Sequence, residues 1–225
     1  TAGNPVVFTS YKDDDHGGDS NADGTTTPAK GNWLGVNINN GLQDLRYCLI
    51  RYATDGVDVN SCSPTIRDCT IEHCSGIGID VNTMPAGTIS GNTIRDCTDN
   101  GIDLYKASPS ILNNIITQCN YPISFNSVQG EFPTISGNTV SGNAWNAWEL
   151  TSEIQGNCTI PDIQNMGWAY VGSWSVKDGV TVTVPAGRVF KGNGTYVSVY
   201  GLLVSQGTAG NPVVFTSYKD DDHGG

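Results

Sequence analysis

A short acidic stretch near the start of the chain, DDDHGGDSNADG at positions 13–24, has the residue types of a calcium loop. Asp19, Asn21 and Asp23 stand at alternate positions and are followed by Gly24. Calcium loops offer oxygen ligands at the first, third and fifth positions and then turn at a glycine, so this spacing matches the first half of such a loop. We therefore predict one Ca²⁺ site here, with ligands among Asp13, Asp14, Asp15, Asp19, Asn21 and Asp23.

The second half of the loop departs from the calcium pattern. Its twelfth position, which is normally acidic, is Lys30, so we expect the aspartates at 13–15 to supply the missing carboxylate. Five carboxylates within eleven residues repel one another unless a cation lies among them; the alternative is a solvated acidic loop. His16 is expected to be an ordinary loop residue, because a hard, oxygen-bound cation does not favour imidazole.

A second set of carboxylates recurs within short runs rich in β-branched residues. These runs are VDVN (57–60), IDVN (79–82), IDLY (102–105), ISFN (123–126), WELT (148–151) and WAYV (168–171). Because side chains alternate between the two faces of a strand, the first residue of each run points inward and the second points outward. The predicted inward set is Val57, Ile79, Ile102, Ile123, Trp148 and Trp168, and the outward set is Asp58, Asp80, Asp103, Ser124 and Glu149.

The outward carboxylates have spacings that could support glycoside chemistry. Strands on neighbouring coils lie about 5 Å apart and those on alternate coils about 10 Å apart, which brackets the separations in retaining and inverting glycosidases. If the chain acts on polysaccharide, we expect Asp58, Asp80 and Asp103 to carry the reaction. However, the column has no lysine or arginine, and His73 lies in a different strand without an evident nucleophile. We therefore predict that the chain is not an enzyme and that the column is a solvated acidic stripe.

The runs belong to an internal repeat, which indicates the architecture. SPTIRDCTIEHCSGIGIDVN (63–82) aligns with AGTISGNTIRDCTDNGIDLY (86–105), and similar units follow at 108–126 and 132–151. Each unit holds very short strands separated by Gly, Asn, Asp and Pro, without the apolar spacing of a helix. Winding each unit around a common axis pairs every strand with the coils above and below. We predict an all-β chain, a right-handed single-stranded parallel β-helix (β-solenoid) of roughly nine coils, forming one domain over 1–225.

Cysteine and asparagine fall into two columns of this repeat. In a solenoid such columns stack as ladders, in which small thiols fill space and amides bond to their neighbours along the axis. We expect Cys74, Cys97 and Cys119 to be stacked free thiols rather than a metal or redox site; Cys62 and Cys158 lie outside both columns. The first column is Cys48, Cys69, Asn92, Asn114 and Asn138, and the second is Ala53, Cys74, Cys97, Cys119 and Asn143.

The chain is acidic, with 11 Lys and Arg against 22 Asp and Glu in 225 residues and a net charge of −11. This balance argues against nucleic acid and anionic membranes as partners and is compatible with bound divalent cations. No apolar run long enough to span a bilayer occurs, so we expect no membrane span. There is no basic and then apolar leader, so a secretion signal is expected to lie outside this sequence or to have been removed.

The stretch VTVTVPAGRVFKGNGTYVSVYGLLVSQGTAGNPVVFTSYKDDDHGG (180–225), read on into DSNADGTTTPAKGNWLGV (19–36), resembles the right-handed β-helix repeats of large secreted bacterial surface proteins. Those repeats carry a valine-rich strand, PAG, FTS, an aspartate-glycine loop and GxW in series. The coils between 45 and 171 resemble their body. The resemblance implies an extracellular or cell-surface location and a calcium-binding DxNxDG loop. The family includes adhesins, matrix components and enzymes, so it leaves the activity open.

The first segment of the chain, TAGNPVVFTSYKDDDHGG at 1–18, recurs at 208–225. A window taken from a tandem array, with a unit that spans 1–207, would have this form; a duplicated cap added by an engineer is the alternative. We expect NPVVFTS at 4–10 and at 211–217 to form equivalent strands. In an array, these strands would be covered by 202–207 on one side and by 33–38 on the other.

The sequence therefore predicts a structural unit over 1–207, followed at 208–225 by a repeat of its own start. Its function is expected to be that of a repeat in an extracellular surface fibre or filament stabilised by Ca²⁺, with copies of itself as partners. Surface polysaccharide is a further candidate partner. The alternatives are a hydrolase or lyase that uses the acidic column, and a carbohydrate-binding adhesin that uses exposed aromatic residues such as Trp145 or Trp174.

Overall fold

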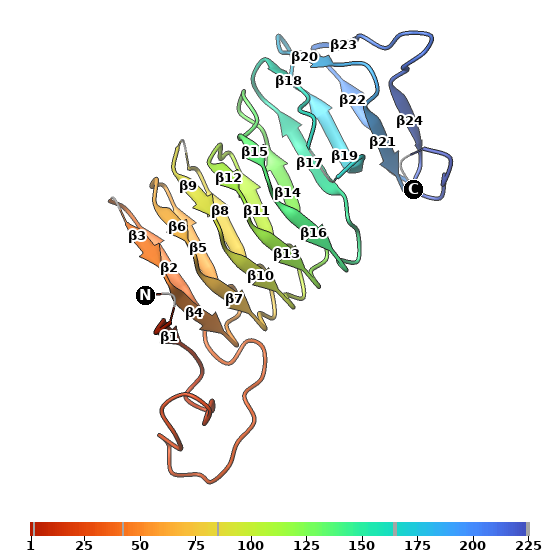
Figure 1. The fold of residues 1–225 in the computed structure, drawn as a ribbon. Coiled ribbons are helices and arrows are strands. Elements are labelled where there is room, and N and C mark those ends of the chain that lie inside the picture. The colour runs from red at the N-terminus through yellow and green to blue at the C-terminus, as the bar shows by residue number, and fades with distance from the viewer. Residues whose placement is uncertain (2, 42, 85, 164–165, 224–225) are drawn as a thin grey trace.

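The computed structural model describes residues 1, 3–41, 43–84, 86–163 and 166–223, and Figure 1 shows them as a stack of coils around one axis. Short β-branched runs form the strands, and residues such as Gly, Asn and Asp form the corners between them. The 24 strands of these residues pair in parallel, and no helix occurs among them. The described part accordingly offers no helix long and apolar enough to cross a bilayer. The all-β class and the parallel β-solenoid are confirmed.

Successive strands fall on three faces in turn, so each coil of the first part of the chain contributes one strand to each of three sheets. The five-stranded sheet contains β3 (Asp44–Arg46), β6 (Thr65–Arg67), β9 (Thr88–Ser90), β12 (Ser110–Leu112) and β15 (Ile135–Ser136). The six-stranded sheet contains β1 (Val6–Phe8), β4 (Cys48–Arg51), β7 (Thr70–Glu72), β10 (Thr93–Arg95), β13 (Ile115–Thr117) and β16 (Thr139–Ser141).

The third sheet runs the full length of the stack. Its ten strands are β2 (Val36–Asn39), β5 (Val57–Asn60), β8 (Ile79–Asn82), β11 (Ile102–Tyr105), β14 (Ile123–Ser127), β17 (Trp148–Ile154), β19 (Ala169–Val176), β21 (Val189–Gly192), β22 (Val197–Val199) and β24 (Val214–Ser217). A three-stranded sheet of β18 (Cys158–Thr159), β20 (Thr181–Val184) and β23 (Leu202–Ser205) completes the C-terminal coils.

The C-terminal coils differ from the body because their strands are longer and use fewer sheets. The five-stranded sheet ends at β15 and the six-stranded sheet at β16. β17 and β19 lengthen to 7 and 8 residues, and a shift of register divides each into two halves. The first half of β19 pairs with β21 and the second half pairs with β22. The ten-stranded sheet thus divides into two adjoining parts, and the three-stranded sheet forms the remaining side.

The register of the ten-stranded sheet shows how the coils repeat. Val57 lies opposite Ile79, which lies opposite Ile102; Ile102 lies opposite Ile123, which lies opposite Trp148. All five side chains are at most 3% exposed. The predicted repeat and this part of the inward column are therefore confirmed.

The last member of the predicted inward column is wrong. Ala169, not Trp168, lies opposite Trp148, and Ala169 is fully buried. Trp168 precedes the strand, packs edge-on against Trp145 and lies under Lys191, whose Nζ is 4.7 Å from its ring centre. The inward residue after Trp148 in the stack is thus Ala169, one residue later in the chain than an alignment of the two tryptophans assumes.

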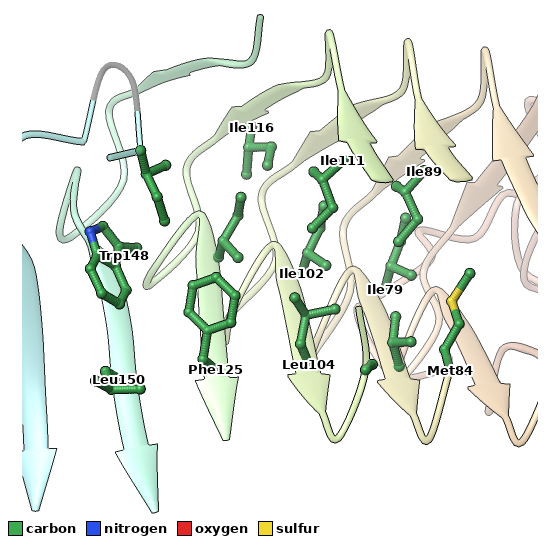
Figure 2. Packing of buried hydrophobic residues seen from close by; sticks show 14 of the residues in the cluster. Ile79, Met84, Ile89, Ile102, Leu104, Ile111, Ile116, Phe125, Trp148 and Leu150 are labelled. Atoms are coloured by element: carbon green, nitrogen blue, oxygen red, sulfur yellow. The ribbon is translucent and has the colours of Figure 1, made fainter. Parts of the chain in front are cut away.

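Stacked aliphatic side chains fill the interior, as Figure 2 shows. Ile79 and Ile102 from the ten-stranded sheet face Ile89 and Ile111 from the five-stranded sheet, and all four are fully buried. Burying such a side chain contributes about 1.5–3 kcal/mol to the free energy of unfolding. Because every coil repeats these contacts, stability accumulates coil by coil, and only the two ends of the stack lack a neighbouring layer.

The predicted asparagine ladder is confirmed at the corner before the six-stranded sheet. Asn92 Nδ2 donates to Asn114 Oδ1 at 3.0 Å, and Asn114 Nδ2 donates to Asn138 Oδ1 at 3.0 Å. Asn92 Oδ1 accepts from Cys69 N at 3.0 Å, which joins the thiol part of the column to the amide part. These bonds satisfy polar groups that lie inside the coil, where an unpaired amide would be destabilising.

The second predicted column is confirmed as a ladder of free thiols. Cys74, Cys97 and Cys119 are at most 4% exposed, and all seven cysteines are free. Burial raises the pKa of Cys69, in the first column, to about 12. A hydrogen bond with Cys97 and burial together raise the pKa of Cys119. Such thiols remain protonated and unreactive at neutral pH.

Candidate functional site

A long loop between β1 and β2 carries the predicted calcium stretch and leaves the stack near its N-terminal end (Figure 1). The later part of this loop returns to the coils. Gly31 N donates to Ala53 O at 3.0 Å, and Lys30 Nζ donates to Asp96 Oδ1 at 2.7 Å. Lys30, at the twelfth loop position, is therefore used to attach the loop to the coils.

The predicted ligands at the tip of the loop close a local turn. Asp19 Oδ1 accepts from Asp23 N at 3.2 Å, and Asp19 Oδ2 accepts from Gly24 N at 3.1 Å. Asn21 Nδ2 donates to Asp23 Oδ2 at 2.8 Å. Gly24 has a φ of +86°, a left-handed conformation that explains the glycine at this position.

Three oxygen atoms of the predicted ligand set are buried without a hydrogen-bond partner among the described residues: Asp13 Oδ1, Asp14 Oδ1 and Asn21 Oδ1. Asp13 is only 2% exposed, and its other oxygen, Oδ2, accepts from Thr9 Oγ1 at 2.5 Å. Carboxylate and amide oxygens are the ligands that Ca²⁺ prefers, and buried polar atoms are normally satisfied. The donor set thus fits a calcium ion by its chemistry.

The carboxylates of the loop do not converge on one point. No group of three or more His, Cys, Asp or Glu side chains in the described part of the chain is arranged to hold a metal. Asp14 Oδ2 accepts from Thr26 N at 2.7 Å, Asp15 is exposed, and Asp13 Oδ2 lies 3.9 Å from Arg51 Nη1. A common site for all six predicted ligands would require the loop to rearrange, and the site stays a prediction.

The predicted acidic column lies on the outer face of the ten-stranded sheet. Asp58, Asp80 and Asp103 lie opposite one another on β5, β8 and β11, and Ser124 and Glu149 continue the column on β14 and β17. Strands in a sheet are about 4.8 Å apart, so neighbouring carboxylates have roughly the separation of the two carboxyl groups in retaining glycosidases.

Burial and repulsion perturb the carboxyl groups of this column. Burial raises the pKa of Asp80 to about 6, the charges of Asp103 and Asp58 add to the effect, and a hydrogen bond from Asn82 opposes it. Burial, followed by the charge of Asp55, likewise raises the pKa of Asp58. A carboxyl group that titrates near neutral pH can act as a general acid or accept a cation in place of its proton.

The middle of the column is covered by neutral donors. Asp103 is 4% exposed and accepts from Asn100 Nδ2 at 3.2 Å and from Asn126 Nδ2 at 2.7 Å. Ser124 Oγ donates to Glu149 Oε2 at 2.7 Å. These bonds hold both carboxylates in place. They also make Asp103 less accessible than the predicted solvated acidic stripe implies.

None of the five residues of the predicted column is a lysine or arginine, but the row of outward positions continues beyond Glu149 to a lysine. Tyr170 lies opposite Glu149, and Lys191 lies opposite Tyr170. Lys191 is 1% exposed, and its Nζ donates to Asp220 O at 2.8 Å. WAYV is the last of the similar runs in the sequence, and this lysine lies in the coil after it, two strands beyond the last carboxylate.

The two aromatic residues considered for sugar binding differ in the structure. Trp174 is 1% exposed and packs against Phe190 at 6.3 Å between ring centres, so its ring is not an exposed platform. Trp145 is half-buried and lies 5.6 Å from Tyr170 and 6.3 Å from Tyr121. It remains the candidate for a contact with a sugar ring.

A network of ion pairs that the sequence motifs did not indicate lies on the outer face of the six-stranded sheet. Glu72 is 4% exposed and lies opposite both Arg51 and Arg95, with contacts of 3.3 Å to Arg51 Nε and 2.5 Å to Arg95 Nη2. At the next corner, His73 Nδ1 lies 2.5 Å from Asp96 Oδ2. The signal in the sequence is the coil spacing, because the repeat that aligns the aspartates also aligns Glu72 with both arginines.

Comparison with protein-family models matches residues 30–214 to the right-handed β-helix region. No curated protein and no solved structure gives a match. The matched part includes the acidic column and the ion-pair network, whereas the calcium-type stretch at 13–24 lies outside it. Parallel strands, the regular stacking of inward residues from coil to coil and this match lead to one conclusion: the chain belongs to the right-handed β-helix family.

Proposed function

We propose that the chain is a structural unit of an extracellular surface fibre, in which β-solenoid units follow one another end to end or in tandem and bind Ca²⁺. The observation that carries this proposal is that the duplicated segment folds in the same way at both places. Thr9 Oγ1 donates to Asp13 Oδ2 at 2.5 Å, and Thr216 Oγ1 donates to Asp220 Oδ2 at 2.7 Å. The sequence of this segment therefore specifies its turn in both settings.

The backbone of the two turns agrees as well. Asp13 N donates to Ser10 O and Asp220 N donates to Ser217 O, both at 3.0 Å. The following histidine returns to the same carboxylate in each copy, at 3.2 Å in the first and 3.0 Å in the second. The copies are equivalent elements at opposite ends of one unit, as an array requires.

The two copies are paired on opposite sides. β1 pairs with β4 of the following coil, β24 pairs with β21 of the preceding coil, and neither has a second neighbour among the described residues. The predicted covering segments are wrong, because 202–205 pairs with β20 and 36–39 pairs with β5. A strand in a solenoid pairs with one a whole coil away, not with the segment beside it in sequence. In an array, a single strand would have both β21 and β4 as neighbours.

An extracellular location is compatible with the free cysteines. Six of the seven thiols are buried, and burial raises the pKa of Cys158, the remaining one, to about 11. Oxidation requires an accessible thiolate, so these residues would persist unpaired in an oxidising environment. The net charge of −11 also favours a hydrated surface over aggregation.

The calcium part of the proposal predicts a change in stability. A ligand that binds only the folded state adds about 2.7 kcal/mol to the free energy of unfolding at a hundred times its Kd. Melting with Ca²⁺ and with chelator should therefore differ, and Asp19→Ala combined with Asp23→Ala should remove the difference. Asp178→Ala, at an exposed turn elsewhere, is the control. Equal melting temperatures with and without Ca²⁺ would show that calcium has no structural role.

The array part can be tested with a two-unit chain, made of residues 1–207 followed directly by residues 1–225. We expect electron microscopy to show one continuous rod about twice as long as the single unit. The melting temperature should rise, because the joint removes two open ends. Two separate particles joined by a mobile link, melting like the single unit, would contradict the proposal.

One observation favours a second function, the cleavage of a polysaccharide. Asp80 has a pKa raised to about 6 by burial, and it lies between two further carboxylates, Asp58 and Asp103. The test is incubation with neutral polysaccharides and polyuronates, followed by measurement of new reducing ends. Cleavage by the unaltered chain that is lost in Asp80→Asn would establish an enzyme; no cleavage of any polymer would leave the structural function.

A further inference from the structure

Both ends of the solenoid leave three strand edges without a neighbour among the described residues. At the N-terminal end these strands are β1, β2 and β3, and each pairs only with the coil that follows. At the C-terminal end they are β22, β23 and β24, and each pairs only with the coil that precedes. The two ends therefore offer equal numbers of edges, and the duplicated strand is the first of the three in chain order at the N-terminal end and the last at the C-terminal end.

The duplicated strand shows how the first pair of edges meets. In β24, Phe215 lies opposite Phe190 with ring centres 4.9 Å apart, and it remains 48% exposed on its other side. In β1, the same residue, Phe8, lies opposite the buried Ile50. Superposing the two copies of this segment, whose strands share Val7 and Phe8 with Val214 and Phe215, would place one phenylalanine between Phe190 of one unit and Ile50 of the next. In the proposed array, residues 208–223 would correspond to residues 1–16 of the next unit.

With that strand fixed, the second pair of edges comes together in register. β22 is the next strand after β21, and β2 is the next strand after β1. Since β21 would pair with the shared strand, β22 would lie beside β2 of the next unit. Val197 and Val199 lie opposite buried residues of β19 and so point inward, although Val199 is 46% exposed. In β2, Val36 packs against the core and Ile38 is 7% exposed. Inward residues would meet inward residues along the whole edge.

The third pair of edges agrees with the other two. β23 would lie beside β3 of the next unit. Leu203 lies opposite the buried Val182, and Leu45 lies opposite the buried Ile66, so both leucines point inward. An apolar hollow of about 470 Å³ opens at this end between β22, β23 and β24. The inward side chains of the next unit, which include Ile38 and Leu45, are apolar and would fill this hollow.

We infer that consecutive units meet in a three-strand joint, in which β21 continues through the shared strand into β4, β22 into β2, and β23 into β3 of a second copy. This inference rests on the proposed function and adds which strands meet and which side chains face each other. The ten-stranded sheet of one unit would thereby continue in two parts, through β21 into the six-stranded sheet of the next unit and through β22 into its ten-stranded sheet. The three-stranded sheet would continue through β23 into the five-stranded sheet.

Hydrogen exchange measured by mass spectrometry on the two-unit chain tests the joint, with the single chain of residues 1–225 as reference. Peptides from β2, β3, β22 and β23 occur once at the joint and once at a free end. We expect each to exchange in two equal components, one at the rate of the reference and one at least tenfold slower. A continuous rod whose peptides show only the fast component would overturn the joint and leave the proposed function standing. Separate particles would overturn both.

A matched pair of variants locates the effect. Val199→Asp is introduced either into the first unit, where the residue would lie in the joint, or into the second unit, where it lies at the free end. We expect the first variant to abolish the slow component and to lower the melting temperature, and the second to change neither. Equal behaviour of the two variants would contradict the proposed register.

Discussion

Two outward columns of charge lie on the same coils, one on the six-stranded sheet and one on the ten-stranded sheet, and they differ in sign pattern. On the six-stranded sheet the charges alternate, and the central carboxylate is held at 3.3 and 2.5 Å by the two guanidinium groups. On the same coils of the ten-stranded sheet the charges are all negative. The first column is Arg51, Glu72 and Arg95, and the second is Asp58, Asp80 and Asp103.

The difference is that the charges of one column are neutralised within the stack, whereas those of the other column are not. Glu72 is neutralised by its neighbours in the stack, so that column has a structural role and needs no outside partner. Asp80 has like charges on both sides, and its pKa is raised by burial and by those charges. A proton, a cation or a hydrogen-bond donor from outside would stabilise the acidic column, whereas none would stabilise the paired one.

The largest expected effect comes from removing the central charge of the paired column. Glu72→Gln would leave Arg51 and Arg95 facing each other across a buried amide. Breaking a buried ion pair costs about 3 kcal/mol or more, but the Arg95 side chain is 50% exposed, which reduces the loss. We expect the free energy of unfolding, measured in urea, to fall by about 2 kcal/mol. Glu131→Gln, at an exposed position, is the control and should be neutral. A loss no larger than that of the control would mean that the network does not stabilise the fold.

In the acidic column, removing the central charge is expected to raise the free energy of unfolding at neutral pH instead of lowering it. The pKa of Asp80 is about 6 in the folded chain, above the ordinary value near 3.9, so the unfolded chain releases its proton first. Stability should then fall as pH rises from about 4 to 6. Asp80→Asn should be neutral at pH 4 and, allowing for solvent screening, stabilise by about 1 kcal/mol at pH 7. Urea unfolding across this range is the measurement, and a destabilised variant at pH 7 would reverse the comparison.

The smallest effect is expected from removing the charge of Asp96, which binds Lys30 of the long loop next to the paired column. Burial alone would raise the pKa of Asp96, but hydrogen bonds from Lys30 and His73 outweigh it and hold that pKa below its ordinary value. The stability from this contact should therefore be lost only as pH falls through the lowered pKa. Asp96→Asn should cost about 0.5 kcal/mol at neutral pH, because the groups are partly exposed. It should also speed hydrogen exchange around Gly31; unchanged exchange there would mean that the contact does not hold the loop.

Sequence alone predicted the elements that depend on local periodicity. The inward residues from Val57 to Trp148, the amide ladder around Asn114 and the outward position of Asp80 all follow from side-chain alternation combined with a regular repeat. Small polar residues mark the corners and β-branched residues mark the strands, so each of these coils could be predicted from its own sequence.

The features that depend on coil length and on distant neighbours could not be predicted in this way. Trp168 was misplaced because one coil is a residue longer than its alignment assumed, and a shift of one residue moves a side chain to the other face. The covering strands of the duplicated segment were misassigned because pairing follows space rather than chain order. The partners of Asp13 belong to the loop and to Arg51, and no spacing rule connects those segments.

The change of sheet at the duplicated strand has a geometric consequence for a fibre. If β21 of the ten-stranded sheet continues through the shared strand into β4 of the six-stranded sheet of the next unit, each unit is turned by one side of its roughly triangular section relative to its predecessor. The acidic column would then trace a screw thread around the fibre and return to the same side after about three units. On any one side of such a filament, the acidic column would therefore recur once in about three units. A flat partner could contact the acidic column of one unit in three, whereas a partner wound around the filament could contact that of every unit.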